Sequence, residues 1–359
     1  MANLTVANYG DLVNATKVNY GPKNKIQQVA QNYVNYVLFS LFFKKERMKT
    51  DGGQLIQRNE HLKKFPVARM KSIGQTDTVK IEDVTAQLQV PWRFADTHWA
   101  FTDQDVMLCT NEHKIFDLID VRRNNAMIDF IEMFEAQLWT SPATTSRDIL
   151  GVPHYVVTTA ASTTFGINGT VPTGYTTVAN ISPTTFPNWK NGNVLYTAVT
   201  KADLIPKLRD AFFYCNFQNL EGLKKTDYEA NRDRYVCVTN RAVSSDIEDL
   251  GEAQNENVGR DVASMEVNSR VKDIYSVDGV LTIRRKPIIT SQYLDGVSTN
   301  PFYGLALDYW CFYVHEIMNM KETEVLRVSD THDSYYVAQD TWCNLVCFDR
   351  RRQFVASTS

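Results

Sequence analysis

The sequence predicts an α+β protein, on the evidence of one long helix, one long hairpin and a strand-rich C-terminal part. No Pro or Gly interrupts residues 110–139, where apolar side chains recur at spacings of 4, 3 and 4. The recurring residues are Met127, Ile131, Phe134 and Leu138. At 1.5 Å per residue, a helix of about 30 residues is a rod of roughly 45 Å. The final sixty residues alternate like strands, with one face formed by Tyr335, Val337, Cys343, Leu345 and Cys347.

The first hundred residues are predicted to lack a core of their own. Residues 1–46 form an arm, which is polar at first and has a helix-like apolar pattern over residues 26–43. Residues 47–100 carry the breaks and the alternation of a long β-hairpin, including Gly52-Gly53. Because an isolated two-stranded ribbon is only marginally stable in water, we expect this hairpin to pack on a surface outside itself.

The middle of the chain is predicted to mix helices, strands and polar loops. A second helix is expected near residues 203–215, with Pro206 close to its start, and a strand is expected at residues 234–239. The polar stretch 244–257 is assigned no element, and residues 280–289 are predicted to form strands around a basic turn. No internal repeat is found.

The composition indicates an ordinary globular protein whose small net charge gives no strong electrostatic attraction to a charged partner. Of its 359 residues, 43% are hydrophobic and 22% charged, and the formal net charge is -3. The six cysteines form no CxxC pair and several lie in apolar runs, which indicates free, buried thiols in a reducing compartment. The first apolar run, residues 36–43, is far shorter than the ~20 residues of a membrane helix. No membrane partner is therefore expected.

The motifs of catalytic and cofactor sites are missing from the sequence. There is no P-loop, GxGxxG or GxSxG pattern. His315-Glu316 begins like a zinc-protease motif, but Asn319 stands where the second histidine ligand would be. Asp103 and Asp105 precede the long helix, where acidic side chains are stabilised by the helix dipole. We therefore predict no catalytic residue, no cofactor, no metal site and no enzymatic activity.

Two adjacent segments of the chain carry opposite charge. Residues 44–71 hold nine basic side chains against three acidic ones, and residues 96–135 hold nine acidic against three basic. These segments could pair within one subunit or between neighbours, which would steer assembly, or they are two solvated faces whose ion pairs contribute little. The inter-subunit contact candidates are Lys63, Lys64, Arg69, Lys71, Asp117, Asp120, Asp129 and Glu132.

The order of these elements resembles that of the HK97-like major capsid proteins of tailed bacteriophages. The resemblance covers nearly the whole chain and rests on order and spacing. The stretches that carry it are Trp92-Arg93-Phe94 before Phe101-Thr102-Asp103, Trp189-Lys190-Asn191 after Phe165-Gly166-Ile167, Arg284-Arg285-Lys286-Pro287-Ile288, Leu307-Asp308-Tyr309-Trp310, and the closing run from Asn344 to Arg351.

The resemblance implies a division of the chain and a structural role. The implied parts are an N-terminal arm (1–46), an E-loop hairpin (47–100), a peripheral domain with a spine helix (101–195), an axial domain (196–300) and closing strands of the peripheral domain (301–359). Subunits of this family self-assemble into hexamers and pentamers that form an icosahedral shell around the genome. The protein would therefore be made in the host cytoplasm and reside in the virion.

The resemblance also implies partners besides further copies of the chain. Because the arm-like segment begins almost at Met1, we expect scaffolding to be supplied by a separate protein. Decoration proteins and a portal are further partners that the family allows, and packaged DNA would be contacted weakly. A maturation cross-link is not predicted.

Two other classes of protein remain as alternatives. Another virion protein is one, although portal proteins would be longer and more helical, and tail-tube proteins shorter and richer in β-strands. A nucleic-acid-binding protein that uses the basic stretch 44–71 is the other, and it would show strongly salt-dependent DNA binding. A hydrolase is disfavoured because no nucleophile, base and metal constellation is present.

Overall fold

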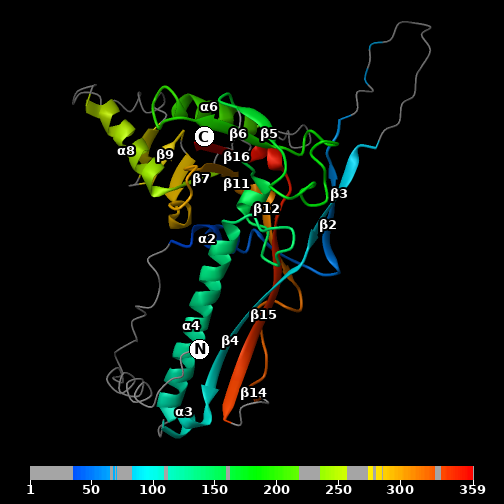
Figure 1. Cartoon of the computed structure of the whole chain (residues 1–359), viewed down its shortest axis with the longest axis vertical. Helices are drawn as coiled ribbons and strands as arrows, with labels where there is room; N and C mark the ends of the chain where they lie inside the picture. Colours follow the sequence, from blue (N-terminus) through cyan, green and yellow to red (C-terminus); the bar gives the residue numbers. More distant parts are fainter. Residues whose placement is uncertain are drawn as a thin grey trace.

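The computed structural model describes residues 35–64, 68, 70, 83–108, 112–158, 162–217, 235–256, 274–277, 280–284, 286–327 and 333–358. The described chain is elongated and has two bodies (Figure 1). The stalk consists of the long helix α4 (Glu112–Leu138) beside the paired strands β4 (Arg93–Thr102) and β15 (Ser334–Cys347). The head consists of an eight-stranded sheet with the helices α6 (Leu204–Cys215) and α8 (Arg241–Glu256).

The head sheet is mixed and has the strand order β5-β6-β16-β11-β7-β10-β9-β8. Its strands are β5 (Gly166–Gly169), β6 (Asn191–Tyr196), β7 (Tyr235–Thr239), β8 (Ile274–Val277), β9 (Val280–Ile283), β10 (Lys286–Thr290), β11 (Phe302–Ala306) and β16 (Phe354–Thr358). Pairs β6–β16 and β7–β10 are parallel and the others antiparallel. Gly304 lies opposite Phe354, where a Cβ atom would come within 2.2 Å of the ring, so the close packing of β11 on β16 requires glycine.

Both faces of the head sheet are buried, each in a different core. On one face, Cys237 and Phe354 pack with Leu208 and Phe212 of α6 and with Ile247 of α8. On the other face, side chains of β7, β11 and β16 join the larger core that continues into the stalk. Because both faces are covered, the central strand β7 is buried along its whole length, and its first four residues are apolar instead of alternating with polar ones.

The stalk sheet has six strands arranged around β15. The remaining ones are β1 (Met48–Asp51), β12 (Trp310–His315), β13 (Lys321–Glu322) and β14 (Leu326–Arg327). Strand β4 pairs with β15 over ten residues, and Ala95, Thr97 and Trp99 on alternate positions are buried beneath α4. The helix turns a stripe of fully or nearly fully buried residues towards the sheet and the core: Ala126, Phe130, Phe134 and Leu138.

Several predictions are confirmed by these elements. The long helix runs over 27 residues, or about 40 Å, and a further short helix, α3 (Asp103–Leu108), precedes it. Its buried stripe differs in part from the predicted one, since Met127 and Ile131 are only half-buried. The hairpin is present as β2 (Leu55–His61) paired with β3 (Thr85–Pro91), whereas β1 and β4, also from residues 47–100, belong to the stalk sheet. The arm residues 1–34 lie outside the described part.

The prediction for residues 244–257, which assigned no helix or strand to this polar stretch, is wrong. The structure has helix α8 there, beginning at Arg241 and running to Glu256. Among the residues of this helix whose side chains are described, Val243 and Ile247, with half-buried Leu250, are the apolar ones packed in the sheet core. The last sixty residues are strands as predicted, but they serve both bodies: β12 and β15 lie in the stalk sheet, and β11 and β16 in the head sheet.

Candidate inter-subunit surfaces

A buried carboxylate joins the start of the described chain to the long helix. Helix α2 (Val37–Phe42) packs against α4. The side chain of Glu135 in α4 is fully buried and accepts hydrogen bonds from the backbone N–H groups of Leu38 (3.1 Å) and Phe39 (2.7 Å) and from Nε1 of Trp139 (2.8 Å). Burial raises the pKa of Glu135, while these donors act to lower it. Glu135 was counted with the acidic surface of residues 96–135, and the structure instead places it in the core.

A buried arginine ties the head to the stalk. Arg350 lies between β15 of the stalk and β16 of the head, in the short 3-10 helix η6 (Arg350–Arg352). Its guanidinium donates to the carbonyl oxygens of Tyr155 (2.7 Å), Trp189 (2.9 Å) and Thr170 (2.8 Å) and to Oδ1 of Asn191 (3.2 Å). Burial lowers the pKa of Arg350 to about 10, so the group stays charged at neutral pH.

A buried histidine lies beside this arginine. His154 is 2% exposed, in the short helix α5 (Val152–Tyr155), and its ring packs edge-on against the rings of Tyr155 and Tyr175. Its Nδ1 atom has no hydrogen-bond partner. Burial, with the positive charges of Arg350 and Arg93, lowers the pKa of His154 from 6.5 to about 4. The imidazole is therefore neutral at physiological pH.

Asp103 and Asp105, predicted to lie at the positive end of a helix dipole, are in the first turn of the short helix α3 at the far end of the stalk. Asp105 accepts a hydrogen bond from the N–H group of Thr102 (3.0 Å), and the Thr102 hydroxyl accepts one from the N–H of Asp105 (3.3 Å). This reciprocal pair starts α3. Asp105 also forms an ion pair with Arg122 of α4 (2.9 Å), which fixes α3 against the long helix.

The predicted acidic contact residues lie along α4 in different surroundings. Asp120 and Asp129 are exposed, and within the described part of the chain neither forms an ion pair. Glu132 is half-buried and accepts a hydrogen bond from the hydroxyl of Tyr36 (2.9 Å), so it contributes to the α2 joint. The backbone of Asp117 lies in α4, but its side chain is outside the described part.

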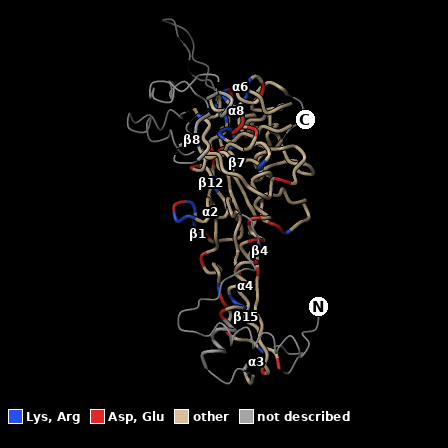
Figure 2. Tube along the Cα trace, turned by 90° about the vertical axis from the view of Figure 1, so that its left-hand side faces the viewer, with Lys and Arg blue, Asp and Glu red and all other residues tan. Residues whose placement is uncertain are grey.

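Two of the predicted basic contact residues, Lys63 and Lys64, lie on the hairpin side of the molecule. Lys63 and Lys64 follow directly after β2, where Asn188 donates a hydrogen bond to the carbonyl of Leu62 (2.8 Å). Arg69 and Lys71 lie outside the described residues. Figure 1 shows the hairpin on the side of the stalk away from α4, so the two lysines and the exposed acidic residues of α4 are not brought together within one subunit. Basic and acidic side chains are interspersed elsewhere along both bodies (Figure 2).

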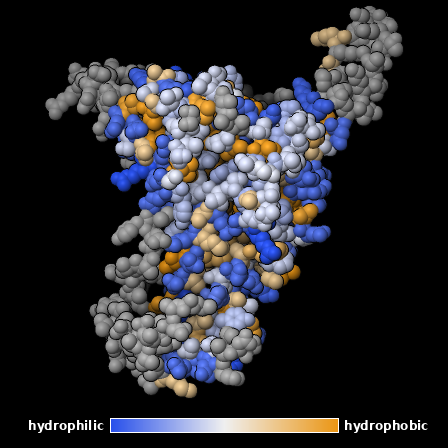
Figure 3. All heavy atoms as spheres, in the orientation of Figure 1, coloured by the Kyte–Doolittle hydropathy of each residue, from blue (hydrophilic) through white to orange (hydrophobic). Residues whose placement is uncertain are grey.

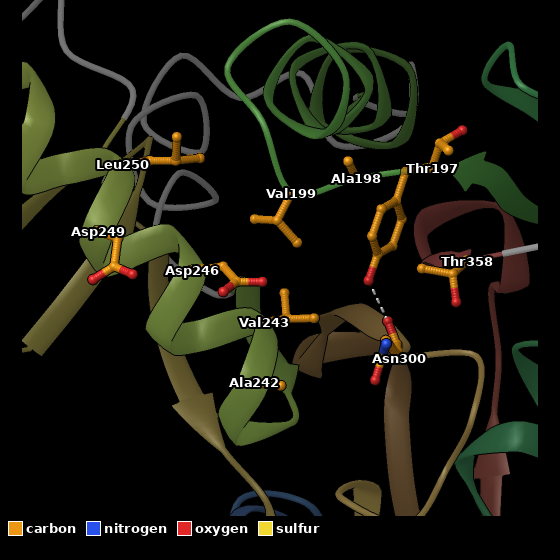
Figure 4. A pocket seen from close by; sticks show the side chains of 11 residues that line it. Thr197, Ala198, Val199, Ala242, Val243, Asp246, Asp249, Leu250, Asn300 and Thr358 are labelled. Carbon is orange, nitrogen blue, oxygen red and sulfur yellow. Dashed lines mark hydrogen bonds between the residues drawn. The ribbon is translucent and has the colours of Figure 1, made fainter.

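Two open hollows lie on the described surface of the subunit. One, of about 400 Å³, lies between β4 and α4 and is lined by residues that include Trp99, Arg122 and Asp129. The other, of about 530 Å³, lies in the head between the segment after β6 and α8 (Figure 4). Hydrophobic side chains also reach the surface of both bodies in separate small groups (Figure 3). Sequence reasoning identified Asp129 but neither hollow, because each is formed by segments distant in sequence.

Nothing in the described residues forms a recognisable catalytic centre. No group of three or more His, Cys, Asp or Glu side chains there could hold a metal ion. Five cysteines are free and buried, as predicted, and burial raises the pKa of each thiol: Cys215, Cys237, Cys311, Cys343 and Cys347. Cys109 is outside the described part. Among the described helices, none is long and apolar enough to cross a membrane.

The whole architecture is shared with proteins of known particles. No family model and no curated protein matches the sequence. A chain of the cyanophage A-1(L) capsid asymmetric unit matches with 17% identity and a TM-score of 0.59, over 96% of this chain and 98% of that one. The capsid of Myoviridae phage XM1 matches with 10% identity and a TM-score of 0.51, and the capsid of a native GTA particle with 8% and 0.51, each over 96% of this chain and 98% of the other.

The chain therefore has the fold of phage capsid proteins. The predicted α+β class and the predicted resemblance to capsid proteins are confirmed at the level of the fold. The assignments of an E-loop, a spine helix and separate domains stay predictions.

Replacing Glu135 with Ala should loosen the joint between α2 and α4. The substitution leaves the N–H groups of Leu38 and Phe39 buried without their acceptor, and we expect it to lower the free energy of unfolding by about 2–4 kcal/mol. Chemical denaturation of the unassembled subunit measures this. Asp120→Ala, on the exposed side of the same helix, is the control and should change the value by less than about 0.5 kcal/mol. Equal effects of the two substitutions would contradict the role of Glu135.

The neutral His154 should make the subunit sensitive to acid. Between pH 6.5 and about 4 the unfolded state binds a proton that the folded state does not, so the free energy of unfolding falls as the pH is lowered through this window. The full contribution is about 3 kcal/mol at 1.36 kcal/mol per pKa unit. Denaturation curves at several pH values should show a shallower pH dependence for His154→Gln than for the wild type. The same pH dependence of the free energy of unfolding in both proteins would contradict the lowered pKa of His154.

Proposed function

We propose that this chain is the major capsid protein of a tailed bacteriophage, with a structural and non-enzymatic role. Its copies assemble into hexamers and pentamers of an icosahedral shell around the phage genome. The observation that carries the proposal is the likeness to the cyanophage capsid chain over 96% of this chain and 98% of that one.

The two bodies have the properties that shell subunits need. The head would be the axial domain that surrounds the local symmetry axes, and it would include β11 and β16 in addition to the predicted residues 196–300. The stalk, with α4 as the spine helix, would be the peripheral domain, and the β2–β3 hairpin would be the E-loop. The hairpin forms a separate two-stranded sheet, and its buried side chains Ile56, Leu88 and Val90 join the core of its own subunit.

The charge distribution supports pairing between subunits. Lys63 and Lys64 on the hairpin and Asp120 and Asp129 on α4 lie on different sides of the subunit, and the two aspartates form no ion pair within the described chain. In a shell, the hairpin of one copy would lie over the α4 helix of the next. Complementary charge at this contact would speed association and fix the register of the two copies.

The shell would be made in the host cytoplasm and function in the virion. A separate scaffolding protein would direct its assembly, with decoration proteins and a portal as further partners. The shell around the packaged DNA would carry little net charge per subunit, since the formal net charge of the whole chain is only -3. Contacts with the genome would therefore be weak.

Expression of the chain tests the proposal directly. Negative-stain electron microscopy and sedimentation velocity should reveal closed shells, tubes, or rings of five and six subunits. A chain that stays monomeric at high concentration, both alone and coexpressed with the scaffolding protein, would contradict the proposed function.

Reversing the hairpin charges should impair assembly without unfolding the subunit. The double substitution Lys63→Glu and Lys64→Glu places like charges over the neighbour's α4, so we expect about a tenfold or greater loss of assembled material in sedimentation velocity. Circular dichroism checks that the subunit stays folded. Lys201→Glu, an exposed lysine in the head, is the matched control. Adding Asp120→Lys and Asp129→Lys to the double variant should restore assembly, and normal shells from the double variant would refute the contact.

A further inference from the structure

The last turn of α6 exposes an aromatic patch, formed by Phe165, Phe213 and Tyr214. Phe213 is 75% exposed and Tyr214 is 54% exposed. The Tyr214 ring stacks on that of Phe165, with the centroids 5.7 Å apart and an angle of 8° between planes, and it meets the Phe213 ring edge-on at 5.4 Å. The stacking holds the rings in a fixed arrangement at the surface, so the patch is a preformed apolar surface.

Charged side chains flank this patch: the exposed Arg209 and Arg284 are basic, and the exposed Asp210, one helical turn before Tyr214, is acidic. Arg209 lies one helical turn before Phe213 on the same face of α6 and is exposed. The exposed Arg284 donates a hydrogen bond to the carbonyl oxygen of Arg209 (3.3 Å), which brings a second guanidinium to this face. Aromatic residues with arginine are the composition typical of the centre of a protein interface.

The hollow in the head, here called the acidic groove, has the opposite character. Val199, Val243 and Leu250 give it apolar walls, and Asp246 and Asp249 of α8 give it negative charge. No Lys or Arg is among the residues that line it. Figure 4 shows the two carboxylates on successive turns of α8, with Val199 facing the helix from the segment after β6. The groove thus offers apolar contact together with negative charge that no basic residue offsets among its described lining residues.

The patch cannot enter the groove of its own subunit. The groove lies at the N-terminal end of α6, after the segment that follows β6, whereas the patch lies in the last turn of this helix. Twelve residues separate these ends by about 18 Å. Both surfaces belong to the same head, so a contact between them has to join two copies.

We propose that Phe213 and Tyr214 of one copy insert into the acidic groove of a second copy, with Arg209 against Asp246 and Asp249. The contact uses a different surface on each copy, and a contact of this kind closes into a ring when the rotation between copies permits it. The inference rests on the proposed shell function and deepens it, because it assigns the residues that join neighbouring heads around one ring.

The size of the patch sets its role in this contact. Each aromatic side chain buries about 150–250 Å², so two of them supply only part of the roughly 800 Å² per partner of a standard interface. The patch is therefore an anchor at the centre of a larger contact. Removing an anchor affects binding far more than removing a residue at the rim.

Serine substitutions of the anchor test the proposal in the full chain. Phe213→Ser with Tyr214→Ser should reduce the fraction of subunits in rings and shells about tenfold in sedimentation velocity. The matched control is Ile317→Ser, since Ile317 is 67% exposed but lies in the stalk. Shells in wild-type amounts from the folded double variant would overturn the inference and leave the proposed function intact. If the wild-type chain assembles under no condition, the proposed function fails and this inference fails with it.

A charge swap tests the proposed pairing of Arg209 with Asp246 and Asp249 even if the serine variant does not fold. Arg209→Glu alone and Asp246→Lys with Asp249→Lys should each impair assembly, because each places like charges together at the contact. A chain that carries all three substitutions restores opposite charges and should assemble. Normal assembly of both partial variants, or no recovery in the combined chain, would overturn the proposed pairing.

Discussion

The buried guanidinium of Arg350 is the interaction on which the arrangement of the two bodies depends. The chain leaves the stalk at the end of β15 and enters the head at β16, and Arg350 lies in the turn between them. Its donors reach three carbonyl oxygens and one side-chain amide from segments between residues 155 and 191. A charge buried in this way is tolerated only when its hydrogen bonds are satisfied, so the contact holds these segments in one relative position.

The C-terminal residues contribute strands to both sheets. Strand β12 continues the stalk and β11 continues the head, joined by the short 3-10 helix η5 (Leu307–Tyr309). Within the last sixty residues the chain thus crosses between the bodies at two neighbouring places, η5 and η6. Around these crossings Trp310, Phe42 and Phe134 belong to one continuous core. The head and stalk therefore form a single folding unit, and a subunit that keeps its own shape can present fixed surfaces to its neighbours.

The elements that could be predicted from the sequence are those whose signal is local. Helix α4 was predictable because 27 residues pass without a helix breaker, and the β2–β3 hairpin because its residues alternate. Helix α8 was missed although Val243, Ile247 and Leu250 have helical spacing, because the polar residues between them outweighed three apolar positions. Glu135 was assigned to a surface because two of its three hydrogen-bond donors come from a segment almost a hundred residues away. The exposed aromatic residues had a local signal, since Phe212, Phe213 and Tyr214 in succession cannot all face one side of a helix.

The buried thiols are distributed over both cores, so their labelling can report where the subunit unfolds locally. Cys215 and Cys237 lie in the core of the head, while Cys311, Cys343 and Cys347 lie in the core shared with the stalk. A thiol with a raised pKa inside a packed core reacts with an alkylating reagent only when its surroundings open. The protein therefore carries natural reporters in each core, and the order in which these positions become labelled records which body opens first.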